Sequence, residues 1–222
     1  MLTHKLYPVT YVGGTLGSSL GFFISLHEGF YPIMPNFELA EDGSVGRQLE
    51  GIININHTVS YINKQLEYIP TDKKVSCRFN SWRRVDGPSE KRDDHRKIPA
   101  VLQKYVGESI HPILIDPNEE LLAMARNRMI DSNKICARLV GEREDKLEQG
   151  VVGMKMNPKA MYNLMDRLPN DSYLVVDILK LYKDYDDSEY EKLCKFVDTQ
   201  PRADWKEGIA SIKRLVDFDE WY

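Results

Sequence analysis

Residues 9–20 read VTYVGGTLGSSL, and this stretch decides the fold class. The β-branched and aromatic run at 9–12 predicts a buried strand, and the glycines between 13 and 17 predict a tight turn. Apolar residues then recur at helical spacing from Ser18 to His27, which predicts a helix that is buried on most sides. A strand, a glycine-rich turn and a buried helix in this order are typical of the opening of an α/β domain.

The rest of the chain repeats the alternation of strands and helices. Short apolar runs predict strands at 74–79, 111–115 and 173–178, with a further short strand at 52–55. Amphipathic spacing predicts helices after Asp116, at 134–149, at 159–168, from Ser188 and from about Pro201. We expect the strand at 173–178 to be central. The pattern favours one α/β domain over residues 1–222, with a mostly parallel sheet that is flanked by helices.

Capping signals mark two of these helices. Asp116 is predicted to cap the helix that follows it, because Pro117 suits the first turn and Glu119 can reach back to the cap. Ser188 and Glu191 form a capping-box pattern. The last two helices are expected to bury Tyr190, Leu193, Cys194 and Val197, and then Trp205, Ile209, Ile212 and Val216.

The charge balance argues against a nucleic-acid or membrane-surface protein. The chain has 222 residues, of which 42% are hydrophobic and 29% are charged, as in ordinary globular proteins. Its 30 Lys and Arg residues against 34 Asp and Glu residues give a net charge of -4, so no broad basic field is expected. The segment at about 80–98 mixes both signs with few apolar residues, and we interpret it as an irregular, solvated loop.

The cysteines and the apolar N-terminal stretch bear on location. Cys77, Cys136 and Cys194 are odd in number and widely spaced, which favours reduced thiols in the cytoplasm over disulfides or a zinc site. We therefore expect no metal. Glycines and serines interrupt the apolar stretch at 9–26, so neither a signal peptide nor a membrane span is predicted.

The glycine-rich turn has the features of an anion site. A strand that enters a helix through glycines brings backbone N–H groups and the positive end of the helix dipole to one point. The turn lacks both the Gly-Lys-Ser/Thr end of a Walker A motif and a Gly-x-Gly-x-x-Gly fingerprint. The alternative is that its glycines only make a tight turn and let the helix pack closely on the sheet.

Tyr11-Val12 followed by Gly17-Ser18-Ser19-Leu20 resembles the 5′-phosphosulfate-binding loop of sulfotransferases. Residues 174–179 and 190–196 are similar to the late strand and helix of that family, and residues 113–115 fall where it places its 3′-phosphate-binding unit. The resemblance implies a three-layer architecture of the P-loop NTPase and sulfotransferase kind. It also implies 3′-phosphoadenosine 5′-phosphosulfate as cofactor and a small-molecule or glycan hydroxyl as acceptor. The nucleotide-binding residues that it implies are Gly13, Gly14, Thr15, Gly17, Ser18, Ser19, Arg126 and Arg128.

Two departures from the family keep other functions open. Thr15 stands where the family carries a lysine, and Ser132 follows the arginines sooner than the family's serine does. For sulfuryl transfer, His57 is the predicted catalytic base that activates the acceptor hydroxyl, with His95 as the second choice. The alternatives are a non-catalytic binding or assembly protein on the same fold and a small nucleotide-dependent phosphotransferase. The oligomeric state stays open.

Overall fold

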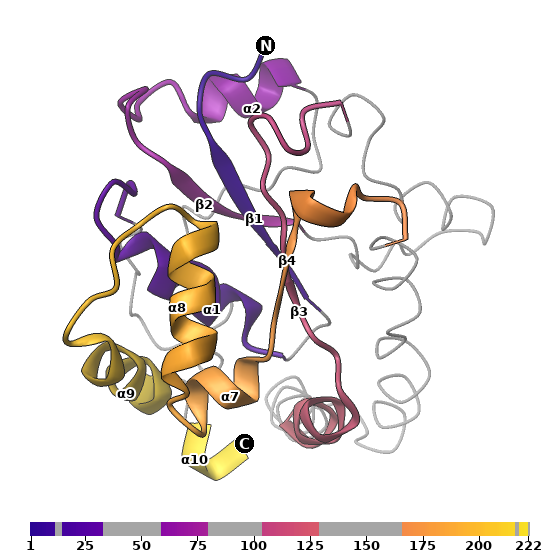
Figure 1. Cartoon of the computed structure of the whole chain (residues 1–222), viewed down its shortest axis with the longest axis vertical. Coiled ribbons are helices and arrows are strands. Elements are labelled where there is room, and N and C mark those ends of the chain that lie inside the picture. Colours follow the sequence, from indigo (N-terminus) through magenta and orange to yellow (C-terminus); the bar gives the residue numbers. More distant parts are fainter. Residues whose placement is uncertain (12–14, 33–58, 80–103, 129–165, 216–217, 222) are drawn as a thin grey trace, which may run out of the picture.

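A computed structural model describes residues 1–11, 15–32, 59–79, 104–128, 166–215 and 218–221. Within these ranges four strands form one parallel sheet in the order β2-β1-β3-β4. The strands are β1 (Leu6–Thr10), β2 (Val75–Phe79), β3 (Ile113–Ile115) and β4 (Leu174–Val176). They run through the middle of the molecule in Figure 1. The predicted α/β fold with a parallel sheet is thus confirmed.

Two strands differ from their predicted positions. β1 begins at Leu6, whereas the sequence pattern places its start after Pro8, a residue that lacks an N–H donor and usually argues against a central strand. β1 nevertheless pairs with β2 from Leu6 to Thr10, and Pro8 lies opposite Cys77 without a break in the register. The prediction of a central strand at 173–178 is wrong for the described sheet, since β4 lies at its edge and Ile178 begins a helix.

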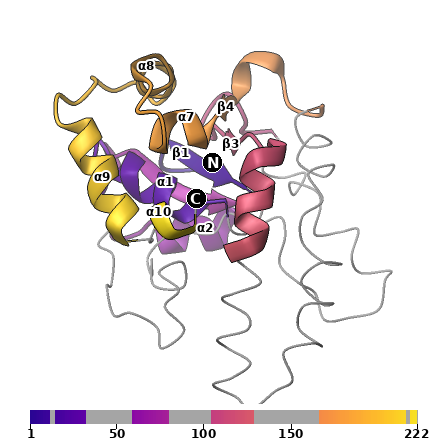
Figure 2. The same cartoon turned by 90° about the horizontal axis from the view of Figure 1, so that it is seen from below.

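Helices cover both faces of the sheet. One face packs against α1 (Gly17–Ser25), α7 (Ile178–Tyr182), α8 (Asp187–Phe196), α9 (Trp205–Leu215) and α10 (Phe218–Trp221). The other face packs against α2 (Val59–Gln65). The helical residues 119–128 contact both cores, with Leu121 in the core that includes α1 and Leu122 against the core that includes α2. Figure 2 shows α8 and α2 on opposite sides of the strands. The described chain therefore forms three layers.

The side chains of the strands alternate between these two layers, as the pleat requires. Those of Tyr7, Val9, Ile113, Ile115, Leu174 and Val176 belong to the core with α1 and α8. Those of Leu6, Val75, Cys77 and Leu114 belong to the core with α2. Because both faces are covered, all five residues of β1 are buried.

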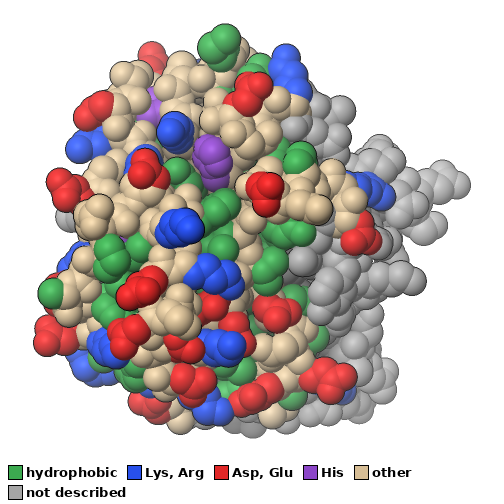
Figure 3. Space-filling view, viewed as in Figure 1, with side chains coloured by type: hydrophobic (Ala, Val, Ile, Leu, Met, Phe, Trp, Pro, Cys, Tyr) green, Lys and Arg blue, Asp and Glu red, His purple; other side chains and the backbone are tan. Residues whose placement is uncertain are grey.

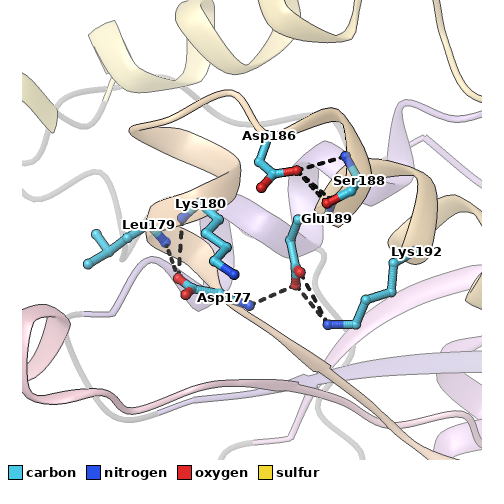
Figure 4. Close-up of polar contacts among 7 residues, drawn as sticks. All are labelled: Asp177, Leu179, Lys180, Asp186, Ser188, Glu189 and Lys192. Carbon is cyan, nitrogen blue, oxygen red and sulfur yellow. Dashed lines mark hydrogen bonds and ion pairs between the residues drawn. The ribbon is translucent and has the colours of Figure 1, made fainter.

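Both predicted capping residues are wrong by two positions. Asn118 caps the helix that begins at residue 119, since its Oδ1 accepts the N–H of Leu121 at 2.9 Å. Asp186 caps α8, and its Oδ1 accepts the N–H groups of Ser188 and Glu189 at 2.8 and 3.2 Å (Figure 4). In each case the N-cap is the residue whose side chain accepts the N–H groups of the first turn, because these groups have no acceptor within the helix.

Several sequence predictions lie outside the described residues. These are the strand at 52–55, the charged loop at about 80–98, the helix at 134–149, Cys136 and Val216. The predicted helix at 159–168 also lies outside except for residues 166–168, which form a turn and a bend. The expected buried faces of the last two helices are confirmed for the other residues, from Tyr190 to Ile212.

A buried hydrogen-bond chain joins α1, α8 and the start of α9. The Nδ1 atom of His27 lies 3.1 Å from the carbonyl oxygen of Phe23, so this nitrogen carries the proton and Nε2 is the acceptor. The hydroxyl of Tyr190 donates to Nε2 at 2.9 Å and accepts the backbone N–H of Arg202 at 2.8 Å. Its ring stacks on Trp205 with a centroid distance of 4.4 Å. One phenol therefore connects three segments.

This chain makes stability depend on pH. Burial lowers the pKa of His27, and the charge of Arg202 lowers it further, against raising effects of the Phe23 and Ile24 carbonyls and of Asp204. The unfolded chain therefore takes up a proton below about pH 6.5 that the folded protein does not bind. We expect the melting temperature to fall from pH 7 to pH 5, and to fall less in His27→Gln. Circular dichroism melts at both pH values measure this, and equal losses in the two proteins would contradict the assignment.

Candidate anion-binding site

The strand order creates a topological switch point at β1, because the strands that follow it in sequence lie on both sides of it. β2 lies on one side of β1, whereas β3 and β4 lie on the other. In open parallel sheets, ligands bind beyond the carboxyl ends of the strands at such a switch point. The turn leaves the carboxyl end of β1, while Asp116 and Asp177 directly follow β3 and β4. The predicted anion site therefore lies at the edge of the sheet that most often binds ligands.

The start of α1 offers backbone donors and no acidic side chain. Leu16 precedes the helix in the left-handed conformation, with φ at 63°, and provides no side-chain cap. The first turn of α1 contains no Asp or Glu. Because the first N–H groups of a helix have no partner within it, this end carries partial positive charge that an anion can neutralise.

Tyr11 packs against this helix start. A Cβ atom added at Gly17 would lie 1.8 Å from Cδ1 and 2.0 Å from Cγ of the Tyr11 ring, so only glycine fits beside the ring. The Tyr11 hydroxyl forms a 3.0 Å hydrogen bond with the Ser18 hydroxyl. Packing thus requires Gly17 whether or not an anion binds there.

Part of the predicted binding set comes together. Thr15, Gly17, Ser18 and Ser19 share the start of α1, where Thr15 and Ser19 are buried and Ser18 is half-buried. Gly13 and Gly14 lie outside the described residues. The predicted bases, His57 and His95, also lie outside them, and so does Ser132.

Arg126 and Arg128 lie in the second half of the helix that follows β3, away from the helix start at the sheet edge. They are part of the helical residues 119–128, with Arg126 exposed and Arg128 half-buried. At 1.5 Å per residue they stand about 10 and 14 Å along the axis from its first residue. A role in holding a 3′-phosphate stays a prediction.

The carboxylates of Asp177, after β4, and of Glu189, in α8, have structural partners. Glu189 is buried, and its Oε1 accepts the N–H of Asp177 at 2.9 Å while Lys192 Nζ donates to both of its oxygens at 3.1 and 3.2 Å. Asp177 caps α7 by accepting the N–H groups of Leu179 and Lys180 (Figure 4). These contacts fix the segment that follows β4 against α8.

Asp116 differs from these two carboxylates. Its pKa is raised by burial and then by the charges of Asp177 and Glu189, and Lys192 only partly offsets them. Perturbed carboxylates at the end of a strand are candidates for a functional role. Sequence reasoning assigned Asp116 to helix capping, a task that Asn118 performs. The usable signal is the repetition of an apolar strand that ends in aspartate, at 113–116 and at 174–177.

Replacing Asp116 tests whether its ionised carboxylate destabilises the folded protein. A raised pKa means that the ionised carboxylate is less stable in the folded protein, so this cost is present at neutral pH and disappears below the ordinary carboxyl pKa. We expect Asp116→Asn to raise the melting temperature at pH 7 and to change it little at pH 3. Asp204→Asn is the control of opposite sign, because Arg202 lowers the pKa of Asp204. A loss of stability in Asp116→Asn at pH 7 would contradict this account.

Three further features of the described residues concern the surface charge, the helices and the metal-binding side chains. Acidic and basic side chains are interspersed on the face shown in Figure 3, without a broad basic patch on that face. No helix in the described ranges is long and apolar enough to cross a membrane. Among the same residues, no group of three or more His, Cys, Asp or Glu is arranged to hold a metal ion.

Comparisons of the chain with protein-family models, curated proteins and solved structures found no match. The functional argument therefore depends on the fold, the position of the turn and the chemistry of its residues.

Proposed function

We propose that the chain binds a nucleotide anion of the 3′-phosphoadenosine 5′-phosphosulfate kind at the start of α1. The observation that carries the proposal is the position of this helix start, which follows β1 at the topological switch point and has no acidic residue in its first turn. The amides of the first turn, together with the Ser18 and Ser19 hydroxyls, would donate to the terminal phosphosulfate. Nucleotide and acceptor are the partners that this site suits.

The proposed reaction is transfer of the sulfuryl group to a hydroxyl of a small molecule or glycan. The bond between sulfur and the bridging phosphate oxygen breaks, and a bond to the acceptor oxygen forms. Adenosine 3′,5′-bisphosphate leaves, and the acceptor proton passes to a base. The helix start would stabilise the charge that develops on the leaving phosphate, which preorganised N–H donors do efficiently.

Asp116 is the described residue that we propose as an alternative to His57 for the base. It follows β3, which pairs with β1, and its raised pKa brings the carboxylate closer to the pKa that suits a general base. A thiol nucleophile is not supported, because Cys77 and Cys194 are buried and burial raises the pKa of each thiol. Buried, unpaired thiols also fit the proposed cytoplasmic location.

Thr15 in the position of the family lysine favours a second candidate, a protein that binds the nucleotide without transferring a group. Lysine would place a full positive charge on the transferred group, whereas threonine offers only a hydroxyl. The two candidates share the binding site and differ in turnover. An acceptor screen with labelled phosphosulfate separates them once binding is shown.

Thermal-shift titration tests the binding proposal. The purified protein is titrated with adenosine 3′,5′-bisphosphate, with ATP plus Mg²⁺ and with sulfate. A ligand at 100 times its dissociation constant adds about 2.7 kcal/mol to the free energy of unfolding, which raises the melting temperature by several degrees. We expect the bisphosphate to give this shift, Ser18→Ala to weaken it and the exposed control Ser211→Ala to leave it unchanged. A shift with ATP plus Mg²⁺ alone would favour a phosphotransferase, and no shift at all would overturn the proposal.

A further inference from the structure

We propose that Tyr11 closes the anion site in the ligand-free protein and must release Ser18 when an anion binds. The inference rests on the proposed function, because it concerns the regulation of the same site. It predicts that the tyrosine hydroxyl competes with the ligand and does not assist it.

The first observation is the 3.0 Å hydrogen bond between the hydroxyls of Tyr11 and Ser18. Ser18 is the second residue of α1, so its hydroxyl stands beside the amides of the first turn. A hydroxyl has one proton to donate, and the phenol can accept that proton or use the oxygen of Ser18 as its own acceptor. Where Ser18 is the donor, an anion that takes its proton breaks the bond to Tyr11. Where the phenol is the donor, the bond can persist, and only the position of the ring opposes the anion.

The second observation is the position of the Tyr11 ring. Three ring atoms, Cδ1, Cγ and Cε1, lie 1.8 to 2.3 Å from where a Cβ of Gly17 would be. The ring thus lies directly against the backbone of the first helical residue and covers it from that side. A ligand that approaches Gly17 from the same side needs the ring to turn away.

The third observation is that the Tyr11 side chain lies at the border between the core and solvent. Tyr182 and Tyr190 are fully buried, whereas Tyr11 is only half-buried and packs at the border of the core. It follows the last residue of β1, so its side chain can rotate towards solvent while the paired strand stays in register. A partly exposed side chain at the end of a strand is suited to act as a gate.

Removing the hydroxyl while keeping the ring separates a gate from a ligand-binding residue. Tyr11→Phe loses the bond to Ser18 and leaves Ser18 available to the anion. Because one hydrogen bond contributes modestly to a folded protein, we expect the affinity for adenosine 3′,5′-bisphosphate to rise about twofold to tenfold. In a Ser18→Ala background the bond is already absent, so adding Tyr11→Phe is expected to change the affinity little.

Isothermal titration calorimetry with adenosine 3′,5′-bisphosphate measures the effect in wild type, Tyr11→Phe, Ser18→Ala and the double variant. Tyr68→Phe is the matched control, because the Tyr68 side chain is 86% exposed. Melting temperatures without ligand show that each variant folds.

Each outcome decides the inference. Tighter binding in Tyr11→Phe that disappears in the Ser18→Ala background supports the gate. Unchanged or weaker binding in Tyr11→Phe, with normal binding by wild type, overturns the gate and leaves the proposed function standing. No binding by any variant overturns both.

Discussion

Replacing Tyr190 with phenylalanine is expected to destabilise the protein by about 2–4 kcal/mol, because the lost hydroxyl leaves two partners unpaired. Tyr190 donates to Nε2 of His27 and accepts the backbone N–H of Arg202. His27 is buried, so its acceptor nitrogen cannot turn to water. The stacking of the ring on Trp205 survives in the variant, which isolates the effect of the hydroxyl.

Tyr182→Phe is the matched control for this prediction. Tyr182 is as deeply buried as Tyr190, but its hydroxyl has no hydrogen-bond partner in the described part of the chain. Removing an unpaired buried hydroxyl is expected to leave stability unchanged or to raise it. Urea unfolding of both variants gives the free energies of unfolding. Equal losses in the two variants would contradict the hydrogen-bond chain.

Gly17→Ala is the second change with a large expected effect. The new Cβ would lie within 2.3 Å of three atoms of the Tyr11 ring, which no real contact allows. Either the ring leaves its place or the helix start shifts, and overpacking of this kind costs about 1–3 kcal/mol. We expect the loss to be much smaller in a Tyr11→Ala background, because the space beside residue 17 is then free.

Gly208→Ala is the control for a helical glycine without such a clash. Gly208 lies in α9, and a Cβ there would meet Cε2 of Phe23 at 3.5 Å, an ordinary contact. Alanine favours helix over glycine by about 1 kcal/mol, so this variant is expected to be more stable than wild type. Denaturation midpoints of both glycine variants measure the contrast. If Gly17→Ala were as stable as Gly208→Ala, the described packing of Tyr11 would be wrong.

Local patterns were sufficient to predict the four described strands and several helices, but not α2, α7 or α10. The run of apolar residues into a glycine-rich turn placed β1 and α1, and helical spacing placed α8 and α9 with their buried faces. The start of β1 was missed because Pro8 argues against a strand when its neighbours are unknown. The helix caps were missed because several polar residues precede each helix, and only the folded backbone selects Asn118 and Asp186.

The candidate site was only partly predictable, for a related reason. The glycines and hydroxyls of the turn are close in sequence, so their pattern identified the helix start. The fit of the Tyr11 ring on Gly17 depends on how the turn folds back, which spacing does not reveal. The pKa of Asp116 is raised first by burial and then by Asp177 and Glu189, which only the pairing of β3 with β4 and the packing of α8 bring near.

The central claim is that an anionic nucleotide binds at the start of α1. It is tested most directly by the amide chemical shifts of ¹⁵N-labelled protein during titration with adenosine 3′,5′-bisphosphate. The account predicts that the largest changes occur at residues 15–20, while α2, on the other face of the sheet, changes little. Saturating ligand that leaves residues 15–20 unchanged, or that shifts mainly amides at the amino ends of the strands near Lys74 and His111, would contradict it.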